Sequence, residues 1–265
     1  MSILSEILAH KRREVRASMK RLPLDFVKTA ALALPRKKNV FRKALRASKK
    51  IGVIAEIKHR SPSKGLLRKD FDPARIAKQY DKAGAAALSV LTDKKYFGGS
   101  PEFLVRVKRV TSLPVLRKDF ILEDYQVYES RLLGADAILL IAGALSTGKM
   151  RSLYKTAKQL GLDVLFEVHS TVELKKVLPL KPTILGVNNR DLRTFKVDLK
   201  VTRELSRMIP RSILLVSESG IGSAADLRGL SAFGVRAVLV GEGLVREKNP
   251  GTALKRLLGA SRGTR

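Results

Sequence analysis

The fold is indicated most clearly by the stretch GADAILLI at residues 134–141. A helical stretch precedes its glycine, a small and a polar residue follow, and an unbroken aliphatic run completes it. Glycine readily takes the left-handed conformation that ends a helix, and an unbroken apolar run is typical of a strand covered on both faces. The same order recurs at 83–91, 161–166 and 234–240. The chain therefore repeats a unit in which a helix leads into a buried strand.

Strands of this kind are expected at regular intervals along the chain. Amphipathic helical stretches, such as 102–110 and 150–159, lie between them. Alternating strands and helices indicate a parallel sheet, and about eight such units predict a closed (β/α)8 barrel of the TIM type, in the α/β class. An open, doubly wound sheet is the alternative. The expected strands are 51–57, 87–91, 114–116, 137–141, 164–166, 183–187, 213–216 and 237–240.

The N-terminal residues 1–48 stand outside this repeat. Ile3, Ile7, Val15 and Met19 recur at the spacing of one helical face. We expect one or two extra helices that pack on the barrel before its first strand. The whole chain, 1–265, is then a single barrel domain with a helical extension at its N-terminus.

Composition excludes several classes of site and of location. The chain has no cysteine, so disulfides, zinc–thiolate sites, iron–sulfur clusters and a cysteine nucleophile are excluded. Residues 1–20 contain no apolar stretch of the kind found in signal peptides. No window approaches the roughly 18 unbroken apolar residues that a membrane helix needs. We expect a soluble, cytoplasmic protein without a membrane partner.

The formal net charge is +29, with a large excess of lysine and arginine in the first fifty residues. Such an excess is compatible with binding to nucleic acid, but a basic, solvated surface is the favoured interpretation, because charge sets solubility and steering more than fold. Aromatic residues are only 5% of the chain and are not interleaved with the basic ones, although stacking residues of that kind are typical of single-strand binding. Nucleic acid is therefore not favoured as a partner, and a basic nucleic-acid-binding protein remains the alternative from another functional class.

Polar residues end one expected strand after another. In a barrel the C-terminal ends of the strands meet at one rim, where active sites lie. Two lysines, three glutamates and an asparagine would converge there, although structural ion pairs in the barrel mouth are the simpler alternative. The residues are Glu56 and Lys58 at the end of the first strand, Lys118 at the end of the third (where Asp119 follows it), Glu167 at the fifth, Asn188 at the sixth and Glu218 at the seventh.

Glycine-containing loops follow the last two expected strands, at 219–222 and 240–243. Glycine lets backbone N–H groups approach an anion, and the loops after strands seven and eight commonly form a phosphate site in barrels. The loop 61–65 adds two serines and a lysine after the first strand. These loops predict binding of a phosphorylated small molecule, and ordinary tight turns are the alternative.

Six segments together resemble the indole-3-glycerol phosphate synthase family. The resemblance covers nearly the whole chain, including an N-terminal extension of the family's type, and the combination in this order is highly specific. The segments are EIKHRSPSKG at 56–65, SVLTD at 89–93 with FGGS at 97–100, PVLRKDF at 114–120, GVNNRDL at 186–192 and SESGI at 217–221.

The resemblance implies a reaction and a set of catalytic residues. The substrate would be 1-(2-carboxyphenylamino)-1-deoxyribulose 5-phosphate, whose ketose carbonyl condenses with the aromatic ring before CO2 and water leave. By motif position, Lys118 resembles the general acid and Glu167 the general base. Lys58 would hold the substrate carboxylate, with Glu56 as an electrostatic partner that orients the lysines. Asn188 and Glu218 would hydrogen-bond to the intermediate.

The same resemblance implies the substrate contacts and the absence of a cofactor. A set of lysines and glutamates can run the proton transfers without a metal ion or a redox cofactor, and lysines crowded in one site are expected to lower one another's pKa. The protein would be a monomer or a homodimer. The implied contacts are Arg190 and Ser219, the aromatic side chains Phe97 and Phe120, and the phosphate-site positions Ser61, Gly220, Gly241 and Glu242.

Some features remain open at this point. Glu242 departs from the pattern of a phosphate site, because only its backbone N–H can help to bind an anion. His10, His59 and His169 are not at metal-ligand spacing, and their contact with substrate is undecided. Another phosphate-binding barrel enzyme, such as phosphoribosylanthranilate isomerase, is the rival within the fold. That isomerase would require a cysteine and aspartate pair, and the chain has no cysteine.

Overall fold

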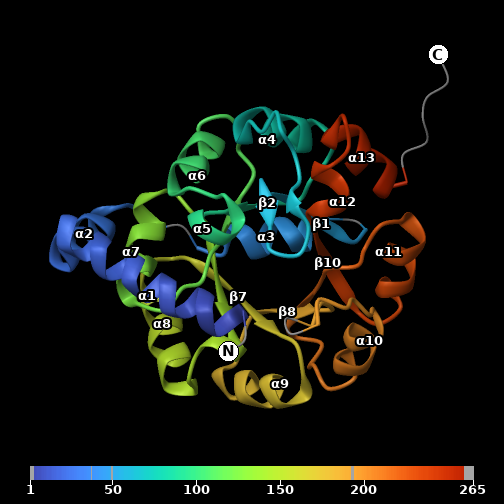
Figure 1. Ribbon diagram of the computed structural model, residues 1–265. Coiled ribbons are helices and arrows are strands. Elements are labelled where there is room, and N and C mark those ends of the chain that lie inside the picture. Colours follow the sequence, from blue (N-terminus) through green and yellow to red (C-terminus); the bar gives the residue numbers. More distant parts are fainter. Residues whose placement is uncertain (1–2, 37, 49, 192–193, 260–265) are drawn as a thin grey trace.

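A closed barrel of parallel strands forms the centre of the computed structural model, which describes residues 3–36, 38–48, 50–191 and 194–259 (Figure 1). The first barrel strand pairs with both the second and the last, which closes the cylinder. The prediction of a (β/α)8 barrel is confirmed. Leu192, the last residue of the 186–192 segment, lies outside the described residues, as do residues 1–2 and 260–265. The barrel strands are β1 (Gly52–Ile57), β4 (Ala87–Leu91), β5 (Val115–Lys118), β6 (Ala137–Ile141), β7 (Asp163–Val168), β8 (Ile184–Asn188), β9 (Leu214–Glu218) and β10 (Val235–Val240).

Four strands extend beyond the apolar runs that predicted them. β5, β7, β8 and β9 include the polar residues Lys118, Glu167, Asn188 and Glu218, which the sequence pattern placed at or after the strand ends. Parallel pairing continues through these positions, since Asn188 pairs in register with Glu218 and Leu91 with Lys118. The backbone at these polar positions is therefore fixed by the barrel itself and not by a loop.

Helices surround the barrel and cover the outer faces of its strands (Figure 1). Their buried aliphatic side chains join those of the strands in one large apolar cluster. The surrounding helices are α4 (Pro73–Lys82), α6 (Pro101–Lys108), α7 (Asp124–Leu132), α8 (Thr147–Gln159), α9 (Thr171–Val177), α10 (Lys200–Ser206), α11 (Ala224–Ser231) and α13 (Pro250–Leu257), with the short helices α5 (Lys94–Phe97), α12 (Glu242–Val245), η1 (Ala142–Ala144) and η2 (Leu178–Leu180).

The barrel interior is filled by a second apolar cluster that includes α3 (Val40–Ala47). Phe41 and Leu45 of this helix are fully buried in the cluster. The backbone N–H of Arg42 donates to Asp163 at the start of β7 (3.0 Å), and the side chain of Arg46 donates to the carbonyl of Ser212, just before β9 (3.3 Å). The helix α3 therefore closes the end at which the strands begin, and a site can form only at the opposite end.

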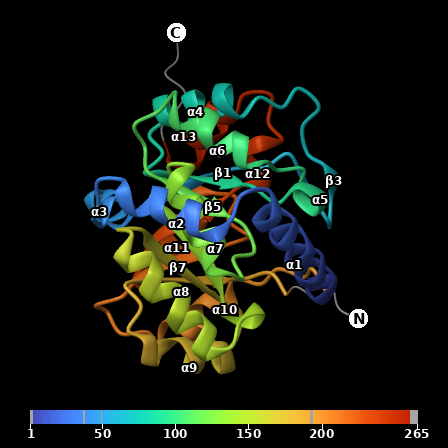
Figure 2. The same cartoon turned by 90° about the vertical axis from the view of Figure 1, so that its left-hand side faces the viewer.

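Two further helices, α1 (Ile3–Arg21) and α2 (Leu24–Ala33), precede α3, so three helices stand before β1 within residues 3–36 and 38–48. The expectation of one or two was therefore too low. The break falls at Pro23, which stands at the N-cap of α2 and disfavours a helical conformation at Leu22. Figure 2 shows α1 beside α5, where Glu6 accepts a hydrogen bond from the hydroxyl of Tyr96 (2.9 Å).

The loop after β1 contains a small hairpin that the sequence did not predict. It consists of β2 (Arg60–Ser61) and β3 (Gly65–Leu66), paired antiparallel. Gly65 has a φ of 64°, so the turn needs a residue that tolerates the left-handed region. The hairpin gives the 61–65 loop a defined backbone above the barrel mouth.

No helix in the described part of the chain is long and apolar enough to cross a membrane.

Candidate active site

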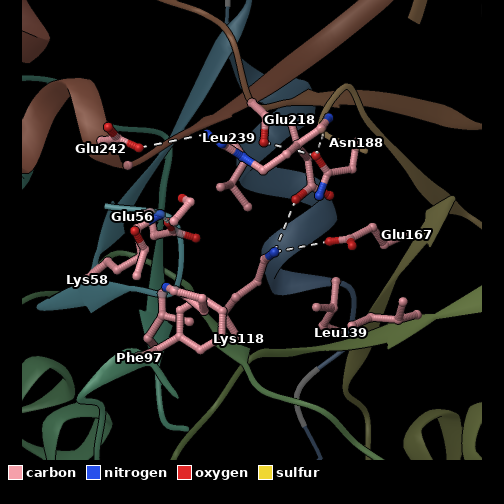
Figure 3. A pocket seen from close by; sticks show the side chains of 18 of the residues that line it. Glu56, Lys58, Phe97, Lys118, Leu139, Glu167, Asn188, Glu218, Leu239 and Glu242 are labelled. Carbon is pink, nitrogen blue, oxygen red and sulfur yellow. Dashed lines mark hydrogen bonds and ion pairs between the residues drawn. The ribbon is translucent and has the colours of Figure 1, made fainter. Parts of the chain in front are cut away.

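One pocket at the C-terminal ends of the barrel strands brings together all the site residues that the sequence predicted. Each of them lines it, and Figure 3 shows several of their side chains pointing into the same space. Ile3, Leu4 and Ile7 of α1 add an apolar wall that the sequence analysis did not assign to the site. The predicted residues are Glu56, Lys58, Ser61, Phe97, Lys118, Phe120, Glu167, Asn188, Arg190, Glu218, Ser219, Gly220, Gly241 and Glu242.

Lys118 lies at the centre of the charged groups. Its Nζ is 3.1 Å from Oε2 of Glu167 and 3.3 Å from Oε2 of Glu218 (Figure 3). Burial lowers the pKa of Lys118, but the negative charges of Glu167, Glu218 and Glu56 outweigh burial and raise it above its usual value. The expectation that neighbouring lysines depress this pKa was wrong, because carboxylates dominate its surroundings. Lys118 is therefore protonated and able to donate.

The two carboxylates beside Lys118 differ in their protonation. Burial raises the pKa of Glu167, yet the charges of Lys118 and His169 and hydrogen bonds from Lys118 and Asn188 lower it to about 2. For Glu218, burial together with Glu167 and Glu56 outweighs the charge of Lys118 and raises the pKa to about 7. Near neutral pH one carboxylate is ionised and the other exchanges a proton.

Gly186 makes the position of Glu218 possible. A Cβ at residue 186 would collide with Oε1 of Glu218. This oxygen has no hydrogen-bond partner within the described part of the chain. An acceptor without a donor in a buried place is costly, so it is suited to a group that a ligand supplies.

A second ion pair lies across the pocket. Nζ of Lys58 is 2.6 Å from Oε1 of Glu56, and both side chains belong to the end of β1 or the residue after it. Gly241 leaves the space that the Glu56 side chain fills, because a Cβ there would overlap with it. Lys58 keeps 16% of its side chain exposed, so its ammonium group remains open to a ligand in the pocket.

The loops after β8 and β9 are joined through Asn188. Its Oδ1 accepts hydrogen bonds from the backbone N–H of Arg190 (3.0 Å) and from Oγ of Ser219 (2.9 Å). Ser219 and Gly220 have φ values of 67° and 80°, so the chain turns sharply there with two consecutive left-handed residues. The turn exposes backbone to the pocket close to Gly241, at the N-cap of α12.

The side chain of Glu242 is held by two arginines. Its carboxylate lies 3.7 Å from Nη2 of Arg190 and 3.3 Å from Nη1 of Arg246. The negative charge that departs from the expected phosphate site is therefore compensated on the protein.

The remaining predicted site residues offer one hydroxyl and two aromatic rings to the pocket. Ser61 is buried, and its Oγ has no hydrogen-bond partner among the described residues. The rings of Phe97 and Phe120 lie with their centroids 6.1 Å apart. An unpartnered donor and an aromatic wall are both features that a polar, aromatic ligand would complete.

The comparisons with known proteins agree with this geometry. The family model described as indole-3-glycerol phosphate synthase matches residues 4–257. The chain belongs to the indole-3-glycerol phosphate synthase family. A member named indole-3-glycerol phosphate synthase from Chromobacterium violaceum is 48% identical over 258 residues, which cover 96% of this chain and 97% of that protein. A relative of the same name from Geobacillus thermodenitrificans is 47% identical, with 98% of each chain covered.

Solved structures outside the indole-3-glycerol phosphate synthase family share the fold. KGPDC from Streptococcus mutans has a TM-score of 0.62 at 11% identity, covering 80% of this chain and 97% of its own. Thiamine phosphate pyrophosphorylase from Pyrococcus furiosus has a TM-score of 0.60 at 16% identity, covering 82% and 96%. At such identities the likeness concerns the barrel alone.

Asp119 and two of the three histidines, His59 and His169, have defined contacts in the structure. Asp119, although it borders the pocket, is bound by Lys11 (2.9 Å), Arg117 (3.2 Å) and Oγ1 of Thr92 (2.5 Å). His59 stacks on Phe71 with centroids 4.7 Å apart.

His169 is the third of these residues. Its Nε2 lies 3.4 Å from Oε1 of Glu167, but it is not among the residues that line the pocket. The likeness to the family signalled none of these contacts.

Proposed function

We propose that this pocket closes the indole ring of 1-(2-carboxyphenylamino)-1-deoxyribulose 5-phosphate, which yields indole-3-glycerol phosphate, CO2 and water. The chain is a lyase of its family and belongs to tryptophan biosynthesis. The observation that carries the proposal is the position of Lys118, a protonated, buried ammonium group between two glutamates in the pocket. Carbonyl condensation needs such a donor where negative charge develops.

Lys118 acts as the general acid in ring closure. As the aromatic carbon attacks C2 of the ribulose, the carbonyl oxygen gains negative charge, and Lys118 donates its proton to it. The low-dielectric surroundings strengthen this interaction relative to water. Lys118 then becomes neutral, and Glu167 loses its closest cationic neighbour.

Glu167 becomes the general base through that loss. With Lys118 protonated, the pKa of Glu167 is held at about 2, where a carboxylate is a poor base. Once Lys118 is neutral, burial raises the pKa of Glu167, so the carboxylate can accept a proton during dehydration. Glu218, with a pKa of about 7, and Asn188 are proposed to hydrogen-bond to the intermediate.

Lys58 holds the carboxylate that leaves as CO2. The ion pair with Glu56 orients the ammonium group. When the substrate enters as a carboxylate, one proton is consumed per turnover, because CO2 and neutral water leave. This balance requires no electron donor or acceptor, and we propose that the enzyme uses neither a cofactor nor a metal ion.

The substrate phosphate is proposed to bind at the backbone near Gly220 and Gly241 and at the hydroxyl of Ser61. Arg190 and Ser219 contact the substrate from the β8 and β9 loops, and the pairing of Glu242 with arginines limits its repulsion of the anion. Phe97 and Phe120 flank the aromatic ring.

We propose that the chain works as one domain, 1–265, in which 1–48 is a helical extension of the barrel. It acts in the cytoplasm as a monomer or homodimer, without a nucleic-acid partner. Three carboxylates in the pocket support this last point, since Glu56, Glu167 and Glu218 would repel a phosphate backbone.

One assay tests the proposed activity. Protein dialysed against a chelator is mixed with 1-(2-carboxyphenylamino)-1-deoxyribulose 5-phosphate, and the fluorescence of indole-3-glycerol phosphate is followed. Turnover is expected without added metal or nucleotide. Absence of product from folded protein would overturn the activity, and turnover that returns only with added metal would overturn the metal-free mechanism.

A further inference from the structure

The side chains of Glu167, His169 and Glu173 form a chain of contacts from the pocket to helix α9. Nε2 of His169 lies 3.4 Å from Oε1 of Glu167, and Nδ1 of His169 lies 3.3 Å from Oε2 of Glu173. His169 follows β7, and Glu173 belongs to α9. Because Oε2 of Glu167 faces Lys118, the imidazole contacts the oxygen of Glu167 that Lys118 leaves free.

We propose that His169 is a positioning residue for the ring-closing reaction, in which it orients Glu167 and balances its charge while Glu173 fixes the imidazole. This inference rests on the proposed function and adds a residue to it. His169 does not line the pocket, so it acts through Glu167 and not on the substrate.

Glu173 is itself held firmly. Its Oε2 accepts a hydrogen bond from the backbone N–H of His169 (2.7 Å), and its own N–H donates to Oγ of Ser170 (3.3 Å) at the start of α9. Gly143 lies close to Oε1 of Glu173, since a Cβ there would come within 2.8 Å. The backbone N–H of His169 therefore holds the carboxylate beside the imidazole, the cap at Ser170 holds its residue in the helix, and Gly143 leaves the space that the side chain occupies.

The two carboxylates determine the protonation of His169. An ionised carboxylate only accepts hydrogen bonds, so the doubly protonated ring is the form that offers an N–H to both carboxylates. Nδ1 hydrogen-bonds to Glu173, and Nε2, which has no hydrogen-bond partner within the described residues, faces Glu167 at 3.4 Å. Burial lowers the pKa of His169, but Glu173, Glu167 and, farther away, Glu218 raise it above the ordinary value. These are the charged groups that face the ring from β7, α9 and β9.

The contact with Glu167 gains importance during turnover. At rest Lys118 neutralises Glu167, and the imidazole is at the long distance of 3.4 Å. After Lys118 has given its proton to the carbonyl oxygen, His169 is the nearest remaining cation to Glu167. It then keeps the carboxylate in place until Glu167 accepts a proton from the intermediate, so no net proton is lost or gained by His169.

Two substitutions test this role against a matched control. His169→Leu removes the hydrogen bond with Glu173 and the ion pair with Glu167, whereas His169→Gln retains an amide N–H that can donate to Glu167. His10 offers the control, because it lies beside Glu14 with the same i,i+4 spacing, 3.8 Å apart and away from the pocket. We expect His169→Leu to lower kcat by about 10–100-fold with KM within about threefold, since a misplaced base affects chemistry more than binding. His169→Gln should recover a large part of kcat, and His10→Leu should leave it unchanged.

The pH dependence of kcat distinguishes a positioning role of His169 from a purely structural one. A histidine that must be protonated contributes activity at low pH and loses it as pH rises through its pKa, so kcat of the wild type should fall on the alkaline side. This fall of kcat at alkaline pH should be absent in His169→Leu. In Glu173→Gln it should move to lower pH by about one unit, because one neighbouring negative charge is removed.

The outcomes distinguish this inference from the proposed function. If the wild type forms no indole-3-glycerol phosphate, the proposed function itself fails. If the wild type is active and folded His169→Leu keeps kcat within threefold and the same pH profile, His169 has no positioning role. Equal losses of kcat in His169→Leu and His169→Gln, with unchanged pH dependence and a lowered melting temperature, would also overturn the inference.

Discussion

Lys118 and Lys11 are both lysines with little solvent exposure that pair with more than one carboxylate, yet their surroundings differ in kind. Lys118 binds glutamates of β7 and β9, keeps 14% of its side chain exposed and faces the pocket. Lys11 of α1 is 1% exposed and contacts Asp93 and Asp119, each at 2.9 Å. One ammonium group is open to a ligand, and the other is enclosed by protein.

Charge balance separates the two clusters. Around Lys11, Asp119 also contacts Arg117 and Thr92, and its charge is fully compensated. Burial raises the pKa of Asp119, but Lys11 and Arg117 outweigh it and lower the pKa to about 2. Around Lys118 the pKa of Glu218 instead rises to about 7. The charge-balanced cluster around Lys11 holds α1 against the barrel. The cluster around Lys118 has an excess of carboxylates, so one of its groups can exchange a proton near neutral pH.

The largest expected effect is on the open cluster. Lys118→Met should reduce kcat by at least about a thousandfold, because general acid catalysis contributes roughly 10²–10⁴-fold and a donor at a developing oxyanion about 10²–10³-fold, without simple additivity. Steady-state kinetics and a melting curve on one preparation check it. A destabilised variant with nearly normal kcat would make Lys118 a structural residue like Lys11.

The enclosed cluster should respond in the opposite way. Lys11→Met leaves Asp93 and Asp119 without their shared cation, and removal of one partner of a buried pair costs about 3–5 kcal/mol. Urea unfolding should show that loss, while kcat of the folded fraction changes only a few-fold. Arg12→Met is the control, since Arg12 is an exposed neighbour on the same helix. Equal stability of the two variants would contradict the contrast.

The sequence predicted the open cluster far better than the enclosed one. Lys118, Glu167 and Glu218 follow apolar runs that identify strands, and parallel strands must bring their C-terminal ends to one rim. The pattern placed these residues near the strand ends, and it missed only that pairing continues through them.

Lys11 gave no comparable signal. It stands in a run of charged residues, and its partners lie 82 and 108 positions away in the sequence, at Asp93 and Asp119. An amphipathic pattern assigns every lysine to the exposed face of a helix because lysine is polar. Whether a lysine is buried depends instead on the partners that the tertiary structure brings to it. The contact between His169 and Glu167 was missed for a different reason. Alternation places residues two positions apart on the same face, but it does not give the distance between their side chains.

The third prediction uses the opposite pKa shifts of the two clusters. The pKa of Glu218 is raised from 4.5 to about 7, so its contribution to stability is full below pH 4.5 and is lost as pH rises through 7. Asp119 is lowered from 3.8 to about 2, so its contribution is full above pH 3.8 and is lost as pH falls through 2.

Glu218→Gln should therefore gain stability relative to the wild type as pH rises from 5 to 8, by up to about 3.5 kcal/mol at roughly 1.4 kcal/mol per pKa unit. Asp119→Asn should lose stability at neutral pH and approach the wild type in acid. Urea unfolding at several pH values measures both. If the stability difference from the wild type changes with pH in the same direction for both variants, the two clusters do not differ as described.

The smallest expected effect is that of a simple anion, which can enter only the open cluster's pocket. Inorganic phosphate should compete with the substrate, because the backbone near Gly220 and Gly241 and the hydroxyl of Ser61 are exposed to the pocket. At ten times its dissociation constant, a ligand of the folded state stabilises by only about 1.4 kcal/mol, so the rise in melting temperature should be a few degrees. Ser61→Ala should weaken both competition and stabilisation, since it removes a buried hydroxyl that has no partner within the described residues. Lys11 is not itself among the residues that line the pocket, so Lys11→Met should retain competition at its own lower stability. Phosphate that stabilises the wild type and Ser61→Ala equally, without raising the apparent KM, binds to the basic surface instead, and the pocket would then lack the proposed phosphate site.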